Sequence, residues 1–308
     1  MIGINRILCP VDLSDCSRHG FDHAVAIARW YGASITLLHV FETVPVAAYA
    51  TGSGSPGDVL TPPERALVVA DLERMIAAET RDGLSITIRR AEGHPSAEIL
   101  DAAVEIAPDL LVIGTHGRSG FQRLVLGSVT EKVLRRASCP VLSVPPRATE
   151  SLAPVAYKRI LCPVDFSDSS LTALKYATSL AEEAQATLTV LHVVDYGLYD
   201  WPDVFDELVS AHQVSIQEFR ARCRESSRER LEQAVPAEAR TWCSVEIVLS
   251  EGKPYREITR AAAERHCDLI VMGVRGRNAL DLALFGSTTQ HVVRLASAPV
   301  LTIREGQP

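Results

Sequence analysis

Short apolar runs alternate with longer amphipathic stretches along the chain. In the first half, the runs that predict strands lie at residues 6–11, 34–41, 85–90, 110–114 and 141–144. The stretches that predict helices lie at residues 17–31, 63–81, 95–107 and 128–137. Such alternation is typical of βαβ units around a parallel sheet, and the uninterrupted apolar runs fit strands buried on both faces. The pattern predicts a doubly wound α/β fold.

The pattern occurs twice. The ten residues 6–15 return at 159–168, with Leu13 and Phe166 as the one difference. This offset is 153 positions, whereas the segments that begin at Glu92 and Glu251 are 159 apart, so the second repeat carries six extra residues between its second and third strands. Residues 145–154, rich in proline and small polar residues, resemble a linker. We therefore expect two tandem domains, 1–148 and 149–308.

Composition narrows the function classes. The 308 residues are 47% apolar and carry a net charge of -7 without a run of lysine and arginine, which argues against nucleic-acid binding. No signal peptide and no apolar stretch of membrane-spanning length is visible, so a cytoplasmic protein without a membrane segment is expected. The seven cysteines are an odd number without a Cys-x-x-Cys pair, which favours reduced, buried thiols.

A glycine motif follows the fourth strand of each repeat. In the first repeat, Gly114 and Gly117 precede Gly127 and Ser128 with nine residues between Gly117 and Gly127. The second repeat matches it, and its residues are Gly273, Gly276, Gly286 and Ser287. Glycines let backbone amides approach phosphate oxygens, and the start of a helix favours an anion. A plain glycine turn with a serine helix cap is the alternative, but duplication in register favours phosphate binding.

Together with Pro10, Val11 and Asp12 after the first strand, this spacing resembles the ATP-binding branch of the universal stress protein family. The resemblance covers nearly the whole chain. It implies a five-stranded sheet in each domain and ATP held between the first strand and the glycine loop. It also implies pairing of domains through their last strands, so that one chain forms a pseudo-dimer and a homodimer is possible.

The resemblance assigns a nucleotide site to each repeat. In the first repeat the implied residues are Pro10, Val11, Asp12, Val40, Gly114, Thr115, Gly117, Arg118, Gly127, Ser128 and Val129. In the second repeat they are Pro163, Val164, Asp165, Val193, Gly273, Val274, Gly276, Arg277, Gly286, Ser287 and Thr288. Val40 and Val193 would meet adenine. Asp12 and Asp165 would lie near the ribose or near Mg²⁺ on the phosphates, unless they cap the following helix.

Three functions remain open. A nucleotide-dependent regulatory protein of the stress response, read by an unknown protein partner, is the first. A slow Mg²⁺-dependent ATPase or nucleotidyl-transfer enzyme is the second, although the phosphate-loop lysine and an evident base for an attacking water are absent from the sequence. A structural module with empty loops is the third.

Four histidines are further candidates for a functional role. His19 and His23 lie four residues apart, and an exposed helix is preferred over a metal site for them. His39 and His192 lie in apolar runs and are expected to be hydrogen-bonded core residues.

Overall fold

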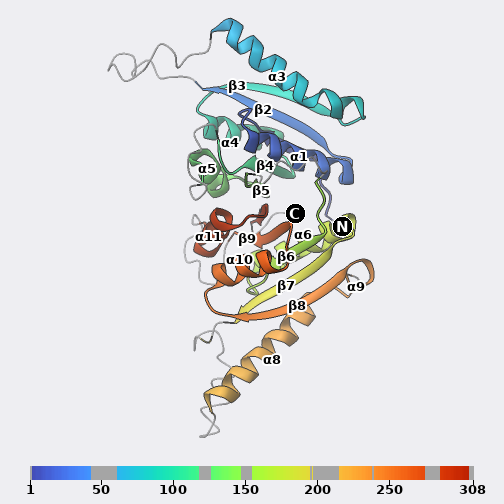
Figure 1. The fold of residues 1–308 in the computed structure, drawn as a ribbon, viewed down its shortest axis with the longest axis vertical. Helices are drawn as coiled ribbons and strands as arrows, with labels where there is room; N and C mark the ends of the chain where they lie inside the picture. Colours follow the sequence, from blue (N-terminus) through green and yellow to red (C-terminus); the bar gives the residue numbers. More distant parts are fainter. Residues whose placement is uncertain are drawn as a thin grey trace, which may run out of the picture. The chain divides into compact units, whose positions relative to one another are not determined.

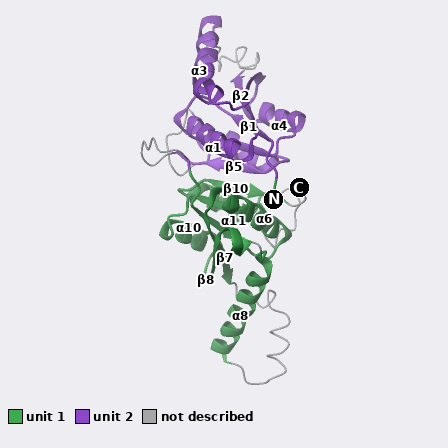
Figure 2. Cartoon of the chain, turned by 90° about the vertical axis from the view of Figure 1, so that its right-hand side faces the viewer, with its two compact units in different colours: residues 1–2, 156–308 green, residues 3–155 purple. Residues whose placement is uncertain are grey.

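The computed structural model describes residues 2–42, 61–117, 126–146, 155–194, 196, 215–237, 239–274 and 285–304. The chain divides into two compact units (Figure 2). We call Gly3–Val155 the N-terminal unit and Ala156–Pro308, together with Met1–Ile2, the C-terminal unit. The boundary predicted near Thr149 lies outside the described residues.

The N-terminal unit is a parallel sheet with helices between its strands (Figure 1). Its elements are β1 (Arg6–Pro10), α1 (Asp15–Tyr31), β2 (Ser34–Glu42), α3 (Pro62–Arg81), β3 (Ile86–Gly93), α4 (Pro95–Ile106), β4 (Leu110–Gly114), α5 (Ser128–Arg136) and β5 (Val141–Val144). The strand order is β3-β2-β1-β4-β5, and the paired strands run parallel.

The C-terminal unit repeats this plan. Its elements are β6 (Arg159–Pro163), α6 (Asp168–Ala184), β7 (Thr187–Val194), α8 (Ile216–Ala234), α9 (Ala239–Trp242), β8 (Ser244–Glu251), α10 (Pro254–Glu264), β9 (Leu269–Gly273), α11 (Ser287–Leu295) and β10 (Val300–Ile303). Its strand order is β8-β7-β6-β9-β10, again parallel. The predicted fold, two tandem doubly wound α/β domains with a five-stranded sheet each, is confirmed.

The core explains the uninterrupted apolar runs. Leu8 and Cys9 of β1 and Leu111 and Val112 of β4 are 0% exposed, because helices cover both faces of the central strands. At the edge, β3 alternates exposed and half-buried residues and extends to Gly93, three residues past its predicted end. Edge strands are less apolar, so the apolar run underestimates their length.

Local signals set the helix ends. Helix α1 begins at Asp15, two residues before its predicted start, because the Ser14 side chain accepts a hydrogen bond from the amide of Ser17 and caps it. It ends at Tyr31, and its C-cap residue is Gly32, whose left-handed backbone (φ 67°) favours glycine. Within the described ranges, no helix is both long and apolar enough to cross a membrane.

The six extra residues of the second repeat lie before the middle of α8. The ion pairs Arg65–Glu92 and Arg224–Glu251 join positions that are each 159 apart in the two repeats. Leu72 of α3 and Leu231 of α8, both 0% exposed, share this offset. The length difference therefore falls between the end of β7 and Arg224.

Candidate functional site

The predicted site residues lie where the order of the strands in the sheet reverses. From β1 the chain proceeds to β2 and β3 on one side, and then crosses to β4 and β5 on the other. Doubly wound folds bind ligands at the carboxyl ends of the two strands that flank such a point. Here these ends carry Asp12, after β1, and the glycine loop, after β4. The C-terminal unit has the same arrangement at β6 and β9.

Asp12 is held in a tight turn. Its Oδ1 atom accepts hydrogen bonds from the amide of Ser14 at 3.0 Å and from the Ser14 hydroxyl at 2.5 Å. The Asp12 amide donates to Oγ of Ser17 at 3.3 Å. Leu13 between them has φ 65°, a left-handed conformation that is costly for a bulky residue. The alternative that Asp12 caps α1 is wrong, because Ser14 is the N-cap residue and Asp12 accepts hydrogen bonds from Ser14.

The glycine loop is fixed by hydrogen bonds to its neighbours. The Thr115 amide donates to the Val144 carbonyl at 2.8 Å, and the Gly127 amide donates to the Thr115 carbonyl at 2.8 Å. Thr130, on the first turn of α5, donates from Oγ1 to the Gly114 carbonyl at 2.7 Å. These bonds join the end of β4 to the start of α5 and to β5.

The turn and the loop meet at Gly117. A Cβ atom added at Gly117 would lie 2.9 Å from Oδ2 of Asp12, so the carboxylate lies directly against the loop backbone. At Gly114, the last residue of β4, an added Cβ atom would lie 3.0 Å from both the carbonyl oxygen and Sγ of Cys16. The spacing of this motif therefore reflects close approach of the loop to the first turn of α1.

Helix α5 begins without a side-chain cap. Its N-cap residue is Gly127, so the alternative of a serine cap at Ser128 is wrong. Ser128 is exposed and Val129 half-buried on the first turn. The amides of a first turn have no partner within their own helix, and the helix dipole adds partial positive charge there. A small anion fits such an end.

The C-terminal unit reproduces these contacts. Oδ1 of Asp165 accepts from the Ser167 amide at 3.1 Å and from its hydroxyl at 2.6 Å. Thr289 donates from Oγ1 to the Gly273 carbonyl at 2.9 Å. Gly286 caps α11 without a side chain, as Gly127 caps α5. Ser287 is exposed and Thr288 half-buried on the first turn of α11.

Several substitutions distinguish the two sites, among them the change of Val129 to Thr288. Cys16 is replaced by Ser169, whose hydroxyl lies 3.3 Å from that of Ser167. Buried Thr115 is replaced by buried Val274, so a hydroxyl is lost. Leu13 is replaced by Phe166.

The Phe166 ring has two close neighbours. Its centroid lies 4.7 Å from that of the His192 ring, and the Arg230 guanidinium of α8 lies 3.9 Å from the Phe166 centroid. Phe166 shares the left-handed φ of 65° with Leu13.

Most of the predicted residues lie at these two edges. Pro10 and Pro163 end β1 and β6, Val11 and Val164 follow them, and Val40 and Val193 are half-buried near the ends of β2 and β7. Arg118, Gly276 and Arg277 lie outside the described residues, as do positions 43–60 and 197–214. The sequence interpretation missed Thr130 and Thr289, although both recur at the third position after the capping glycine.

The histidines divide into two kinds. Nδ1 of His39 donates to the Val11 carbonyl at 2.8 Å, and His192 contacts the Val164 carbonyl in the same way at 2.7 Å, which confirms hydrogen-bonded core residues. His19 and His23 do share a face of α1, with their Nε2 atoms 3.1 Å apart. The exposed helix expected for them is wrong for His23, which is 5% exposed. Among the described residues, no cluster of three or more metal-binding side chains occurs.

The cysteines are free thiols, as predicted. Burial raises the pKa of Cys9 and Cys162 far above the ordinary range. Burial also raises the pKa of Cys16, although hydrogen bonds from His116 and Thr115 oppose it. The pKa of half-buried Cys267 rises to about 11, again chiefly through burial. Such thiols are poor nucleophiles.

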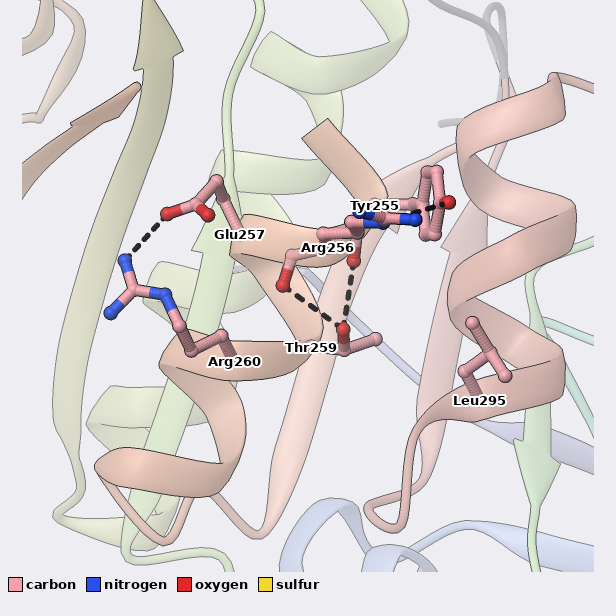
Figure 3. A pocket seen from close by; sticks show the side chains of 6 residues that line it. All are labelled: Tyr255, Arg256, Glu257, Thr259, Arg260 and Leu295. Atoms are coloured by element: carbon pink, nitrogen blue, oxygen red, sulfur yellow. Dashed lines mark hydrogen bonds and ion pairs between the residues drawn. The ribbon is translucent and has the colours of Figure 1, made fainter. Parts of the chain in front are cut away.

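A further hollow of about 690 Å³ is lined by residues of α10 and by Leu295 of α11 (Figure 3). Thr259 donates from Oγ1 to the Tyr255 carbonyl at 2.9 Å, and Arg260 pairs with Glu257 at 2.5 Å. Leu295, 48% exposed, faces them from α11. The lining includes no residue of the predicted nucleotide sites.

Two units with the same strand order and the same aspartate turn after the first strand define a tandem α/β protein. A profile of the universal stress protein family matches residues 3–145 and again residues 156–304. The chain belongs to the universal stress protein family and contains two copies of its domain.

Similar proteins agree with this assignment. A universal stress protein of Methanocaldococcus jannaschii is 36% identical over 140 residues, which is 45% of this chain and 81% of that protein. One of Mycolicibacterium smegmatis is 26% identical over 310 residues, covering 97% of this chain and 96% of the other. The crystal structure of a universal stress protein from Archaeoglobus fulgidus has a TM-score of 0.66 at 21% identity, covering 99% and 100% of the two chains, and shows the shared fold.

Proposed function

We propose that each unit binds ATP at the edge described above and that the chain is a nucleotide-dependent regulatory protein of the stress response. The observation that carries the proposal is the contact between the Asp12 carboxylate and the backbone of Gly117, beside an α5 N-terminus that no side chain caps. Asp165 and Gly286 have equivalent surroundings in the C-terminal unit. A helix start without a side-chain cap and glycines at positions 117 and 127 leave room for phosphates.

The residues present fit a nucleotide. The amides of Ser128 and Val129, on the first turn of α5, would hold the phosphates, and half-buried Val40 would contact adenine. Asp12 would hold the ribose or a Mg²⁺ ion bound to the phosphates. Oδ1 already accepts two hydrogen bonds from Ser14, so the carboxylate is oriented before the ligand arrives.

Regulation is favoured over rapid hydrolysis. Hydrolysis needs a group that positions water and a cation on the terminal phosphate. The described residues around Asp12 and Gly117 offer hydroxyls, backbone amides and the His116 ring, whose Nδ1 lies 2.9 Å from the Thr115 hydroxyl. The buried Cys16 thiol has a raised pKa. A slow Mg²⁺-dependent ATPase or nucleotidyl-transfer activity, with Asp12 and Asp165 holding the metal, is the alternative. A protein partner would read the nucleotide state.

Two measurements test the proposal. Purified protein is denatured and the released nucleotide quantified by chromatography, and Mg²⁺-dependent phosphate release is followed on native protein. We expect up to one ATP per unit and little turnover. Metal-dependent turnover that disappears in Asp12→Asn and Asp165→Asn would favour the enzyme. Protein that neither retains nor binds ATP would refute the site.

Single variants assign the nucleotide to each unit. Asn keeps an oxygen for the Ser14 hydrogen bonds but lacks the charge, so Asp12→Asn should lower the occupancy of the N-terminal unit alone. Asp165→Asn should do the same in the C-terminal unit. The matched control is Asp15→Asn, a change of the same charge on the exposed first turn of α1.

A further inference from the structure

A row of arginines follows one face of α8. Arg220, Arg224 and Arg228 recur every four residues, which places them about 6 Å apart along one side of the helix. Together they line a groove of about 610 Å³, and the other lining residues are Gln217, Ala221, Glu225, Leu249 and Glu251. Leu249 and Glu251 belong to β8, so the groove lies between the helix and this strand.

The strand beside the arginines is at the edge of its sheet. Strand β8 ends the strand order and pairs with β7 on one side (Figure 1). An edge strand offers a row of backbone donors and acceptors to another chain. Half-buried Leu249 packs against Val194 and Cys223 and gives the groove an apolar floor.

Positive charge exceeds negative charge in the groove. Arg224 pairs with Glu251 at 3.0 Å. Of the remaining charged side chains that line the groove, Arg220 and Arg228 are positive and Glu225 is negative. The guanidinium of Arg220 lies 5.1 Å from the Tyr196 ring. Within the described part of the chain, neither Arg220 nor Arg228 forms an ion pair. Both side chains are exposed and available to a ligand.

The N-terminal unit lacks this row. With the offset of 159, Arg224 corresponds to Arg65, which forms the equivalent ion pair. The positions of Arg220 and Arg228, however, are occupied by Thr61 and Val69. The apolar floor residue Leu249 is replaced by Arg90. The groove is therefore a property of the C-terminal unit, next to the place where the second repeat is longer.

We propose that this groove binds an acidic segment of a partner protein in an extended conformation, added as a strand to β8. Alternate residues of an extended chain are about 6.6 Å apart, close to the spacing of the arginines. Carboxylates four positions apart, about 13 Å along an extended chain, would face Arg220 and Arg228, which are about 12 Å apart along the helix. The backbone would pair with the strand edge, and apolar side chains would rest on Leu249. Such strand addition combines main-chain affinity with side-chain selectivity. It does not depend on nucleotide binding.

Fluorescence anisotropy tests the proposal with the full chain and a labelled nonapeptide of alternating Glu and Val. We expect the double variant Arg220→Gln, Arg228→Gln to weaken binding at least about tenfold, because two charge pairs are lost. The control Arg222→Gln, Arg240→Gln removes the same charge outside the groove and should weaken binding less than about twofold. Unchanged thermal midpoints show that all variants fold.

Further arms separate the parts of the proposal. A peptide with Gln in place of Glu should bind at least about tenfold more weakly, and amide hydrogen exchange along β8 should slow when the acidic peptide binds. Equal binding of the Gln peptide, equal weakening by the control pair, or stronger binding of a single-stranded RNA of matched charge would overturn the acidic partner. Equal binding of a peptide N-methylated at alternate backbone positions would overturn strand pairing.

Discussion

Nδ1 of His39 donates a hydrogen bond of 2.8 Å to the carbonyl oxygen of Val11. This bond joins the end of β2 to the turn that carries Asp12. Because the ring and the carbonyl are both buried, the bond holds the backbone at the point where the nucleotide is proposed to lie.

Replacing this histidine should loosen the turn. In His39→Leu the buried Val11 carbonyl loses its partner, and we expect the free energy of unfolding to fall by about 1–3 kcal/mol. Nucleotide occupancy of the N-terminal unit should fall as well. Urea unfolding and nucleotide quantification measure the two effects. His192→Leu is the matched variant, and an effect on both units from either single change would contradict this explanation.

The threonine that fixes the glycine loop should matter in a similar way. Thr130→Val keeps the shape but removes the hydrogen bond to the Gly114 carbonyl, so stability should fall by about 1–2 kcal/mol. Thr130→Ser keeps the hydroxyl and should retain most of the affinity for ATP, which calorimetry can measure. If the Thr130→Val and Thr130→Ser variants bind ATP equally well, the hydroxyl of Thr130 does not position the loop.

Two glycines of the same loop should respond differently to alanine. At Gly114 the new Cβ would meet backbone and sulfur atoms of Cys16 at 3.0–3.1 Å, so the loop must shift and the melting temperature should drop. At Gly117 it would meet the end of the Asp12 side chain, which can rotate away. Gly117→Ala should therefore keep its melting temperature but lose nucleotide. Thermal unfolding of both variants checks this, and a larger drop for Gly117→Ala would contradict it.

The buried thiols should make the protein less stable at alkaline pH. Cys9 and Cys162 ionise near pH 9 when unfolded, but burial raises their pKa in the folded state. Above that pH the unfolded chain binds fewer protons than the folded one, so stability falls as pH rises. The limiting slope is about 1.4 kcal/mol per pH unit for each thiol. Urea midpoints between about pH 9 and 10.5 measure it, and Cys9→Ala with Cys162→Ala should flatten the slope.

The sequence predicted the fold because its signals are local or repeated. Uninterrupted apolar runs located the central strands to within one residue: Leu110–Gly114 agrees, whereas β1 ends at Pro10, one residue before its predicted end. The edge strand β3 was predicted too short, because three of its eight residues are exposed and its last residues carry no continuous apolar signal. The repeat placed Asp12 and Gly117 in one motif, and the structure brings them into contact.

Other parts of the site depend on folding in three dimensions. The hydrogen bond from Thr130 to Gly114 joins residues 16 apart whose distance depends on the whole loop. Ser14 rather than Asp12 caps α1, and both residue types are good caps, so the sequence could not choose between them. His23 is buried because α1 packs its face on the sheet, and helical spacing alone gave no direction for that face.

The left-handed residues Leu13 and Phe166 bear on how this protein could be re-engineered. Glycine at either position would relieve the backbone, yet both copies keep a bulky side chain there. At Phe166 the ring contacts His192 and Arg230, so its packing compensates for the strain. A design rule that inserts glycine wherever φ is positive would remove this compensating packing and give the unfolded chain more conformational freedom. Libraries aimed at stability should therefore vary these two positions among large apolar residues.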